Sequence, residues 1–312
     1  MKTGTVIKST GDKYLVKTEN TEYLCNIRGK FRTSGLRSTS PIAVGDKVGF
    51  EVMSEEQKHG LIQEIRPRKN MLVRKSTNLS KKSHILAANI DLAVLMVTLK
   101  DPETYQLFID RFLVASEKEN VPAALVFNKI DLLDEEEREN LDYLYIMYKS
   151  IGYPCVKISV KEEKNIDEFS RLIAGKTVVI NGNSGVGKSS LLNLLAPGLN
   201  LKTAQISDSH RQGKHTTTFA EMFEIGDARL IDSPGIKGFG LTDIDYNRLS
   251  EYFREMDALR SECKFNNCTH THEPECRIKE AVENYEISPD RYRNYLKILD
   301  EKDDKYREDI YK

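Results

Sequence analysis

The sequence has no apolar run that could cross a membrane. Its longest apolar stretch, LAVLMVTL at residues 92–99, is far shorter than the roughly 20 residues that a spanning helix needs. The first ten residues, MKTGTVIKST, also lack the apolar core of a signal peptide. We therefore expect a cytoplasmic protein without a membrane partner.

Cysteine is scarce, with five in 312 residues. Cys25 and Cys155 stand alone in apolar, strand-like surroundings, where buried and inert thiols are expected. The other three cysteines cluster with two histidines between positions 263 and 276. The cysteine and histidine residues therefore indicate one candidate metal-binding segment, at residues 263–276.

Acidic residues are missing from two stretches near the N-terminus, although the net charge of the whole chain is only −1. Residues 1–75 carry fifteen Lys and Arg against eight Asp and Glu. The acid-free stretches, 24–45 and 65–90, contain Arg28, Lys30, Arg32, Arg37, Arg66, Arg68, Lys69, Arg74, Lys75, Lys81 and Lys82. Because such stretches attract phosphate backbones, we expect contact with nucleic acid. The alternative is a solvated surface on which basic residues cluster by chance.

The N-terminal part, to about residue 73, has short runs rich in Val, Ile and Tyr. Gly, Asn, Asp and Ser separate these runs at intervals typical of a small barrel. The five expected strands are GTVIKS, KYLVKT, EYLCNI, KVGFEV and GLIQEI. Five strands and a basic loop favour an OB-fold that binds RNA, at residues 1–75, although an SH3-like barrel fits the same pattern.

The central part, at residues 83–235, alternates buried strands with amphipathic helices, which is typical of a parallel α/β sheet. The expected strands are IDLAVLMVTL, PAALVFN, PCVKIS, TVVING and ARLID. We predict helices within 106–120, over 135–150 and from Lys188. Residues 239–312 are expected to form a helical domain, with a helix that begins at Ser288-Pro289-Asp290.

A phosphate-binding loop, GNSGVGKS, lies between the strand TVVI and the helical run SSLLNLLA. This context is the one in which the pattern binds a nucleoside triphosphate, with backbone N–H groups and a helix N-terminus toward the phosphates. We expect Lys188 to contact the β- and γ-phosphates and Ser189 to bind Mg²⁺. The predicted phosphate-binding residues are Gly182, Asn183, Ser184, Gly185, Val186, Gly187, Lys188, Ser189 and Ser190.

The run NKID at residues 128–131 predicts that the base is guanine. Asp131 can accept hydrogen bonds from the guanine N1–H and 2-amino groups, a donor pair that adenine lacks. Asn128 is expected to brace neighbouring loops, and Lys129 to lie along the purine ring. Ser159, which follows the strand PCVKI, fits the serine element that closes over the base.

Two switch elements follow the phosphate loop. Asp232-Ser-Pro-Gly235 has the DxxG form that contacts Mg²⁺ and the γ-phosphate in GTPases. The run KHTTT at 214–218 offers a threonine for Mg²⁺, and we choose Thr217, with Thr216 and Thr218 as alternatives. The GTPase elements therefore occur in a circularly permuted order, with NKID first. DSPG leads directly into the C-terminal segment, so nucleotide state is expected to move that segment.

This combination resembles the circularly permuted bacterial GTPases called ribosome small-subunit-dependent GTPase A. The resemblance covers nearly the whole chain: basic barrel, permuted GTPase and zinc domain. It implies a late maturation factor that binds the small ribosomal subunit and its rRNA in the GTP state. It further implies that the subunit stimulates hydrolysis of GTP to GDP and phosphate, and that hydrolysis accompanies release. We expect a monomer with no DNA partner.

Two rival functions fit parts of the sequence. One is an RNA-binding assembly module whose nucleotide site acts only as a sensor. The other is a GTPase that acts on tRNA or on a ribosomal protein.

The resemblance also places one structural zinc ion on Cys263, Cys268, His270 and Cys276. Three thiolates and one imidazole suit a closed tetrahedral Zn²⁺ site, with no position left open for catalysis. A disulfide is the alternative to a zinc site. It would pair two of the three cysteines and leave the third unpaired, and the cytoplasm in which we expect the protein opposes disulfides. His272 is an alternative ligand, but the family pattern favours His270.

The attacking water lacks its usual partner. Ile236 follows DSPG at the position where Ras-like enzymes have a water-orienting Gln, and an apolar side chain cannot orient water. The resemblance implies that His215 takes this catalytic role; the alternative is an exposed loop histidine. Gly185 stands where a potassium-assisted mechanism would need Asn, so the sequence gives that mechanism no support.

Overall fold

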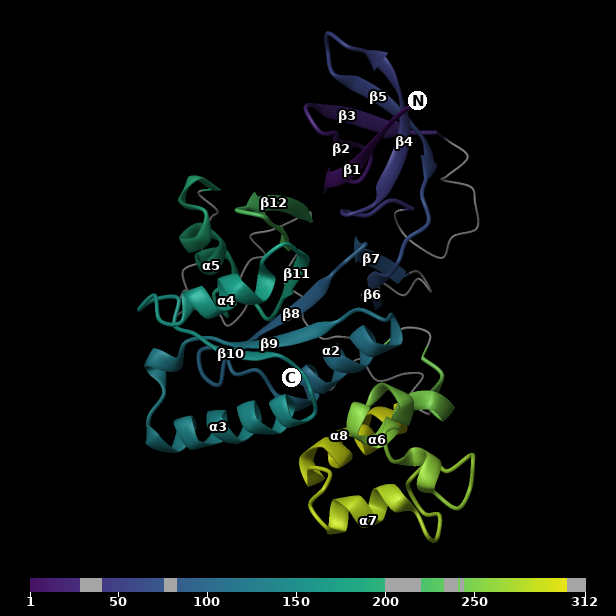
Figure 1. The fold of residues 1–312 in the computed structure, drawn as a ribbon, viewed down its shortest axis with the longest axis vertical. Helices are drawn as coiled ribbons and strands as arrows, with labels where there is room; N and C mark the ends of the chain where they lie inside the picture. Colours follow the sequence, from purple (N-terminus) through teal and green to yellow (C-terminus); the bar gives the residue numbers. More distant parts are fainter. Residues whose placement is uncertain (29–40, 76–82, 200–219, 233–240, 242–243, 302–312) are drawn as a thin grey trace.

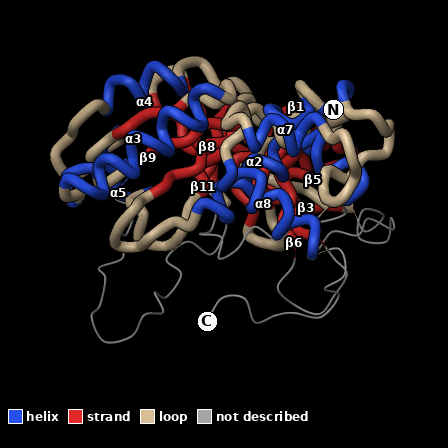
Figure 2. Tube along the Cα trace, turned by 90° about the horizontal axis from the view of Figure 1, so that it is seen from below, coloured by secondary structure: helices blue, strands red, loops and turns tan. Residues whose placement is uncertain are grey.

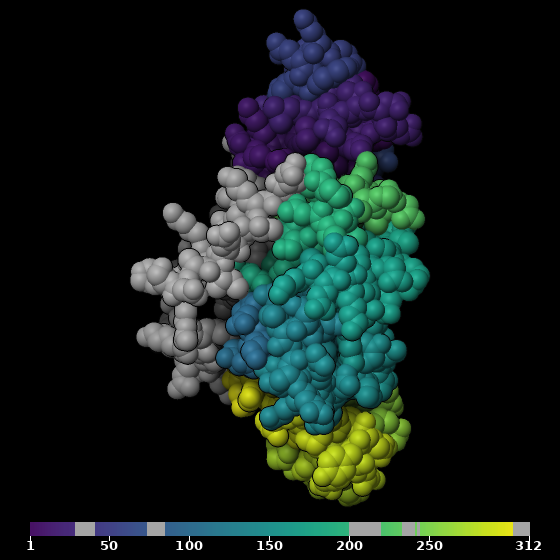
Figure 3. Space-filling view, turned by 90° about the vertical axis from the view of Figure 1, so that its left-hand side faces the viewer, coloured from purple at the N-terminus to yellow at the C-terminus, as the bar shows by residue number. Residues whose placement is uncertain are grey.

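The structure, a computed structural model, describes residues 1–28, 41–75, 83–199, 220–232, 241 and 244–301. These residues form three bodies along the long axis of the molecule, with the barrel at one end, the α/β domain in the middle and the helical domain at the other end (Figure 1). The space-filling view shows the barrel, in purple, seated on the α/β domain (Figure 3). The predicted order of three domain types is confirmed.

The N-terminal body is a closed barrel of five strands. Its strands pair in the order β1-β2-β3-β5-β4, and β4 returns to β1. The strands are β1 (Lys2–Ser9), β2 (Tyr14–Lys17), β3 (Glu22–Ile27), β4 (Lys47–Ser54) and β5 (His59–Ile65). The pair β3–β5 is parallel and the others are antiparallel, which is the Greek-key order of an OB-fold. Alternate residues such as Val6, Tyr14 and Phe50 fill the interior, because side chains along a strand alternate between faces.

A two-stranded hairpin connects the barrel to the α/β domain. It consists of β6 (Met71–Lys75) and β7 (Ser83–Ala88), which the sequence analysis did not predict. Gly45, at φ 93°, packs against this hairpin so closely that a Cβ atom would collide with the carbonyl oxygen of Ala88. The adjacent Asp46 is buried and accepts hydrogen bonds from Arg68 at 2.6 and 2.7 Å. The junction is therefore packed and hydrogen-bonded.

The central body is an α/β sheet. Parallel strands follow the order β10 (Cys155–Lys157), β9 (Ala123–Phe127), β8 (Leu92–Val97), β11 (Thr177–Asn181) and β13 (Ala228–Asp232). Strands β8, β9 and β11 are buried along their whole length, because helices cover both faces of the sheet (Figure 2). The five predicted strands are confirmed.

Four helices cover this sheet: α2 (Gln106–Lys118), α3 (Glu135–Ser150), α4 (Ile166–Ile173) and α5 (Lys188–Leu195). Apolar residues of α2 and α3 pack on one face, and those of α4 and α5 on the other. A capping box between Asp134 and Glu137 fixes the start of α3. Helix α4 was not predicted, whereas the starts of α3 and α5 match the prediction.

An antiparallel strand, β12 (Glu221–Ile225), joins the two bodies. It pairs with β13 on one side and with β1 on the other, where Lys8 lies opposite Glu221. The barrel and the α/β domain therefore share one continuous 11-stranded sheet. Salt bridges Lys8–Glu221 at 2.9 Å and Lys17–Glu224 at 2.6 Å reinforce the seam.

The C-terminal body is helical, as predicted. It contains η3 (Tyr246–Tyr252), α6 (Arg254–Asp257), η4 (Arg260–Glu262), α7 (Arg277–Glu283) and α8 (Pro289–Asp300). It docks on α2 and α3 through Asp110, which is fully buried and accepts hydrogen bonds from Tyr148, Arg291 and Asn294. Arg291 also pairs with Glu255 at 2.7 Å. No described helix has the length and hydropathy of a membrane span.

Candidate guanine-nucleotide site and metal centre

The phosphate loop lies between the buried end of β11 and the first turn of α5. Gly182, Gly185 and Gly187 have φ values of 146°, 87° and 102°, a region that side chains rarely adopt. A Cβ atom on Gly182 would lie 2.7 Å from the carbonyl oxygen of Met96. One on Gly187 would lie 2.5 Å from Nδ2 of Asn128. Two of the glycines are therefore required by close approach as well as by conformation.

Lys188 bends back over the loop that precedes it. Its Nζ donates to the carbonyl oxygens of Gly182 at 2.6 Å and Asn183 at 2.8 Å. The side chain is half-buried, and loss of hydration lowers its pKa to about 8, although the nearby Asp232 carboxylate opposes this shift. Burial destabilises the charged form of Lys188, and a bound anion beside the ammonium would stabilise that form again.

Asn128 joins the base-reading element to the phosphate loop. It is buried, and its Nδ2 donates to the carbonyl oxygen of Val186 at 2.8 Å, across 58 positions of sequence. Its Oδ1 accepts from the backbone N–H of Val160 at 3.1 Å. One side chain therefore connects three loops at the carboxyl edge of the parallel sheet, where α/β proteins bind ligands.

Asp131 and Ser159 are also brought together. The hydroxyl of Ser159 donates to Oδ1 of Asp131 at 2.6 Å and accepts from the N–H of Glu162 at 3.0 Å. Among the described residues, Oδ2 of Asp131 has no hydrogen-bond partner. One carboxylate oxygen is therefore held by Ser159, and the other has no hydrogen-bond partner among the described residues.

Lys129 has a contact that the motifs did not reveal. Its backbone is left-handed, at φ 63°, and its Nζ donates to the carbonyl oxygen of Asp101 in the loop between β8 and α2. Burial lowers the pKa of this lysine. The only signal in the sequence was the position of that loop, since it follows a buried strand at the same sheet edge as NKID.

Asp232 ends β13 beside the phosphate loop. It is buried, and it pairs in parallel register with Ile180 of β11. Ser184, Ser189 and Ser190 are half-buried in the loop and the first turn of α5. His215, Thr217, Gly235 and Ile236 lie outside the described residues.

The Cys/His cluster of the C-terminal body has the geometry of a metal site. The donor atoms of Cys263, Cys268, His270 and Cys276 all lie within 4.8 Å of one another. His270 Nδ1 is 3.6 Å from Cys263 Sγ and 3.5 Å from Cys276 Sγ, and the two sulfurs are 4.0 Å apart. A tetrahedral site with Zn–S of about 2.3 Å and Zn–N of about 2.0 Å has edges of about 3.5–3.8 Å, so the donors fit zinc.

The surroundings of His270 favour its role as a ligand. Burial lowers the pKa of this histidine, which keeps the imidazole neutral. Its carbonyl oxygen accepts from the Tyr292 hydroxyl at 2.6 Å, which fixes the loop. His272 is exposed and lies against Thr271, outside the cluster, and all five cysteines are free. The four predicted residues thus form a possible zinc site, and no disulfide competes with it.

Comparison with known proteins agrees with this geometry. The RsgA N-terminal domain matches residues 3–62, and the RsgA GTPase domain matches residues 65–242. The chain belongs to the RsgA GTPase family. Its membership makes it an enzyme that hydrolyses GTP, and GTPases of this kind use Mg²⁺ with the nucleotide.

Curated relatives of the RsgA family match along the whole chain. The small ribosomal subunit biogenesis GTPase RsgA of Christiangramia forsetii is 49% identical over 311 residues, which is 99% of each chain. The protein of the same name from Flavobacterium johnsoniae is 50% identical over 312 residues, which is 99% of this chain and 96% of that protein.

Two solved structures share this fold. YjeQ from Thermotoga maritima has a TM-score of 0.76 and 37% identity, and the match covers 96% of this chain and 97% of that one. YloQ, described as a circularly permuted GTPase, has a TM-score of 0.74 and 29% identity over 98% of this chain and 97% of that one. The permuted order of motifs in this RsgA family member agrees with that description.

Proposed function

We propose that this chain acts in the late maturation of the small ribosomal subunit. It binds the subunit and its rRNA in the GTP state and is released with hydrolysis. The observation that carries the proposal is the Asn128–Val186 hydrogen bond, which connects the NKID element to the phosphate loop. The names of the relatives, small ribosomal subunit biogenesis GTPase, supply the partner.

The nucleotide site is proposed to work by position and charge. Asp131, held by Ser159, reads guanine, and Lys129 lies along the ring. Residues 182–190 bind the phosphates, and Asp232 and Gly235 respond to the γ-phosphate. Ser189 and Thr217 are the proposed Mg²⁺ ligands, and His215 the proposed catalytic residue.

Zinc is proposed to be structural. Cys263, Cys268, His270 and Cys276 would hold it, and it would supply a cross-link between η4 and the start of α7 rather than any chemical step. Four protein ligands leave no coordination position for a substrate.

The remaining properties are proposed as well. We propose cytoplasmic location, a monomer, and no DNA or membrane partner. We also propose domain limits of 1–75, 83–235 and 239–312; the hairpin β6–β7 lies between the first two.

The proposal is tested by sedimentation with purified small ribosomal subunits. The protein loaded with a non-hydrolysable GTP analogue should sediment with small subunits and not with large subunits. The protein loaded with GDP should remain in the supernatant. Equal sedimentation in both nucleotide states would contradict the proposed cycle, and binding to large subunits alone would contradict the proposed partner.

A further inference from the structure

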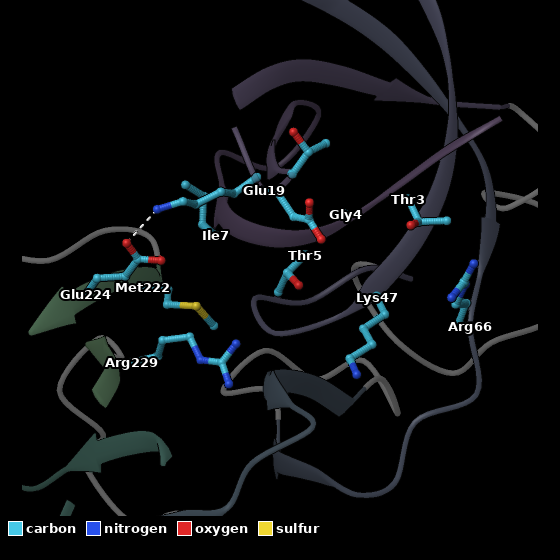
Figure 4. A pocket seen from close by; sticks show the side chains of 12 residues that line it. Thr3, Gly4, Thr5, Ile7, Glu19, Lys47, Arg66, Met222, Glu224 and Arg229 are labelled. Carbon is cyan, nitrogen blue, oxygen red and sulfur yellow. Dashed lines mark hydrogen bonds and ion pairs between the residues drawn. The ribbon is translucent and has the colours of Figure 1, made fainter. Parts of the chain in front are cut away.

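A cleft of about 330 Å³ lies where the barrel meets the α/β domain. Its walls are β1, the end of β2 and the start of β4 from the barrel, and the β12–β13 hairpin from the α/β domain (Figure 4). The GTP site lies elsewhere, at the carboxyl edge of the parallel sheet. The cleft is therefore a second site, separate from the one that binds nucleotide.

Positive side chains outnumber negative ones in this cleft. Four cationic residues line it, against two carboxylates, Glu19 and Glu224. The cations are Lys17, Lys47, Arg66 and Arg229. The cleft therefore attracts anions.

The carboxylates do not neutralise the two central cations. Glu224 is held by Lys17 at 2.6 Å. Within the part of the chain that the structure describes, no carboxylate lies within 4.0 Å of the charged groups of Lys47 or Arg229. In Figure 4 these two side chains extend into the space between the barrel and the hairpin, one from each body. An ammonium and a guanidinium thus share one cleft without an internal counter-ion.

The backbone holds the cations in place. The N–H of Arg66 donates to the carbonyl oxygen of Lys47 at 2.8 Å, which sets these two residues side by side. Arg229 lies opposite Glu224 in the register of β12 and β13. Lys47 lies opposite Thr5 in the register of β4 and β1, and the Thr5 hydroxyl is an additional donor on the wall. Arginine, lysine and threonine donors are those that proteins use to bind phosphate oxygens.

We propose that this cleft binds a phosphate group of an RNA backbone. The proposal rests on the proposed function, because it identifies part of the surface that would contact rRNA. The cleft is larger than a phosphate ion needs, and it lies on the acid-poor barrel, so a phosphodiester of a longer chain fits better than a free ion.

Occupancy would join the two bodies. Lys47 belongs to the barrel and Arg229 to β13, so one phosphate bound by both would connect the two bodies. This connection would add to the salt bridges Lys8–Glu221 and Lys17–Glu224, which already link them. In sequence, β12 and β13 lie between the KHTTT run and DSPG. RNA bound here therefore contacts the hairpin that follows one switch element in the sequence and leads into the other.

The experiment compares a Lys47→Gln/Arg229→Gln double variant with an Arg138→Gln/Arg171→Gln control. Arg138 and Arg171 are exposed on α3 and α4, so the control removes the same charge away from the cleft. Affinity for small ribosomal subunits and for a mixed-sequence single-stranded RNA oligonucleotide is measured at several salt concentrations. Affinity for GDP on the same preparations checks the fold.

The cleft variant should bind both RNA probes about tenfold more weakly than the control, and its salt slope should fall by about 1, since the loss of one phosphate contact lowers the slope by about 0.7–0.9. Equal affinities and slopes for the two variants would overturn the proposal. If inorganic phosphate binds at the cleft but RNA binding is the same in both variants, the site takes free anions only and the proposal is wrong. If the wild type binds the oligonucleotide through the cleft but not small subunits, the proposed function fails while the cleft proposal stands.

Discussion

At the scale of single residues, we propose that Asp131 carries the guanine specificity. Ser159 fixes one carboxylate oxygen at 2.6 Å, so the group is oriented before the base arrives. Such preorganisation lowers the entropic cost of binding. The Ser159–Asp131 bond joins two short elements separated by 28 positions, and we propose that both contribute to binding one base.

Asp131→Asn should lower affinity for GDP and raise affinity for xanthosine diphosphate. The new amide can donate to the xanthine carbonyl, whereas it cannot accept two bonds from guanine donors. Loss of hydrogen bonds to a charged group costs about 1.5–3 kcal/mol each. Competition with a fluorescent nucleotide measures both affinities. Ser159→Ala is the matched control, and it should lower the affinity for GDP without changing the preference for guanine over xanthine. If Asp131→Asn leaves the affinity for GDP unchanged, Asp131 is not the residue that reads the base.

Lys188 should make nucleotide binding depend on pH. Burial lowers its pKa to about 8 in the free protein, and phosphate charge beside it should raise that pKa. Binding therefore takes up a proton above about pH 8, and affinity for GDP should fall by up to about tenfold per pH unit there. Calorimetry at about pH 8.5 in two buffers of different ionisation enthalpy measures the proton uptake directly. Binding heats that do not depend on the buffer would contradict this assignment.

The sequence motifs predicted which side chains come together in the candidate site, but not which backbone groups lie beside them. NKID and the glycine-rich loop pointed to Asn128 and Lys188 because these chemistries need those side chains. The Met96 carbonyl beside Gly182 and the Asp101 carbonyl beside Lys129 were not foreseen. Every residue has a carbonyl group, so a backbone acceptor leaves no mark in the sequence.

Strands were predicted best where both faces of the sheet are buried, because such strands are continuous apolar runs in the sequence. The runs at β8, β9 and β11 are continuous and apolar because no face meets water. Strand β12, EMFEI, was missed because its two glutamates are uncommon in strands. The turn at Gly226-Asp227 that follows was the available signal of a hairpin. The pairing of β12 with β1 joins residues more than 200 positions apart, which no local pattern specifies.

Cys268→Ser should remove the metal and loosen α7 and the loop before it. The loss of one thiolate breaks a site that would cross-link η4 to α7, and the described residues of the candidate GTP site belong to other elements. Elemental analysis and hydrogen exchange of α7 measure the two effects, and GDP affinity should stay at the wild-type value.

His272→Ala is the matched control for the metal site. This histidine lies outside the four-residue cluster and should leave zinc at one equivalent. Protein purified without chelator that contains no zinc would contradict the assignment of the site.

The whole molecule is held together by two different junctions. The barrel shares a sheet edge with the α/β domain, whereas the helical domain docks through a buried polar network around Asp110 and Arg291. Burial raises the pKa of Asp110, and the two carboxylates around Arg291 raise its pKa despite burial. The order of the domains could be predicted from motifs, but these contacts depend on side chains that meet only after folding.

Arg291→Met should destabilise the helical domain by about 3–5 kcal/mol, because it leaves the buried Asp110 carboxylate and the partly buried Glu255 carboxylate without their cation. Asp110→Asn/Arg291→Met should recover part of this loss, since the uncompensated charge at position 110 is removed. Chemical denaturation of both variants measures the difference. A double variant less stable than the single one would show that the charge pair is not what holds this interface.

GTP hydrolysis by the intact protein tests the central claim most directly. The rate is measured for the protein alone, with small ribosomal subunits, with large subunits and with tRNA. An RsgA-type maturation factor should hydrolyse GTP slowly alone and faster only with small subunits, because positioning of the reacting groups depends on that partner. Equal stimulation by large subunits or tRNA, or no stimulation by small subunits, would contradict the account.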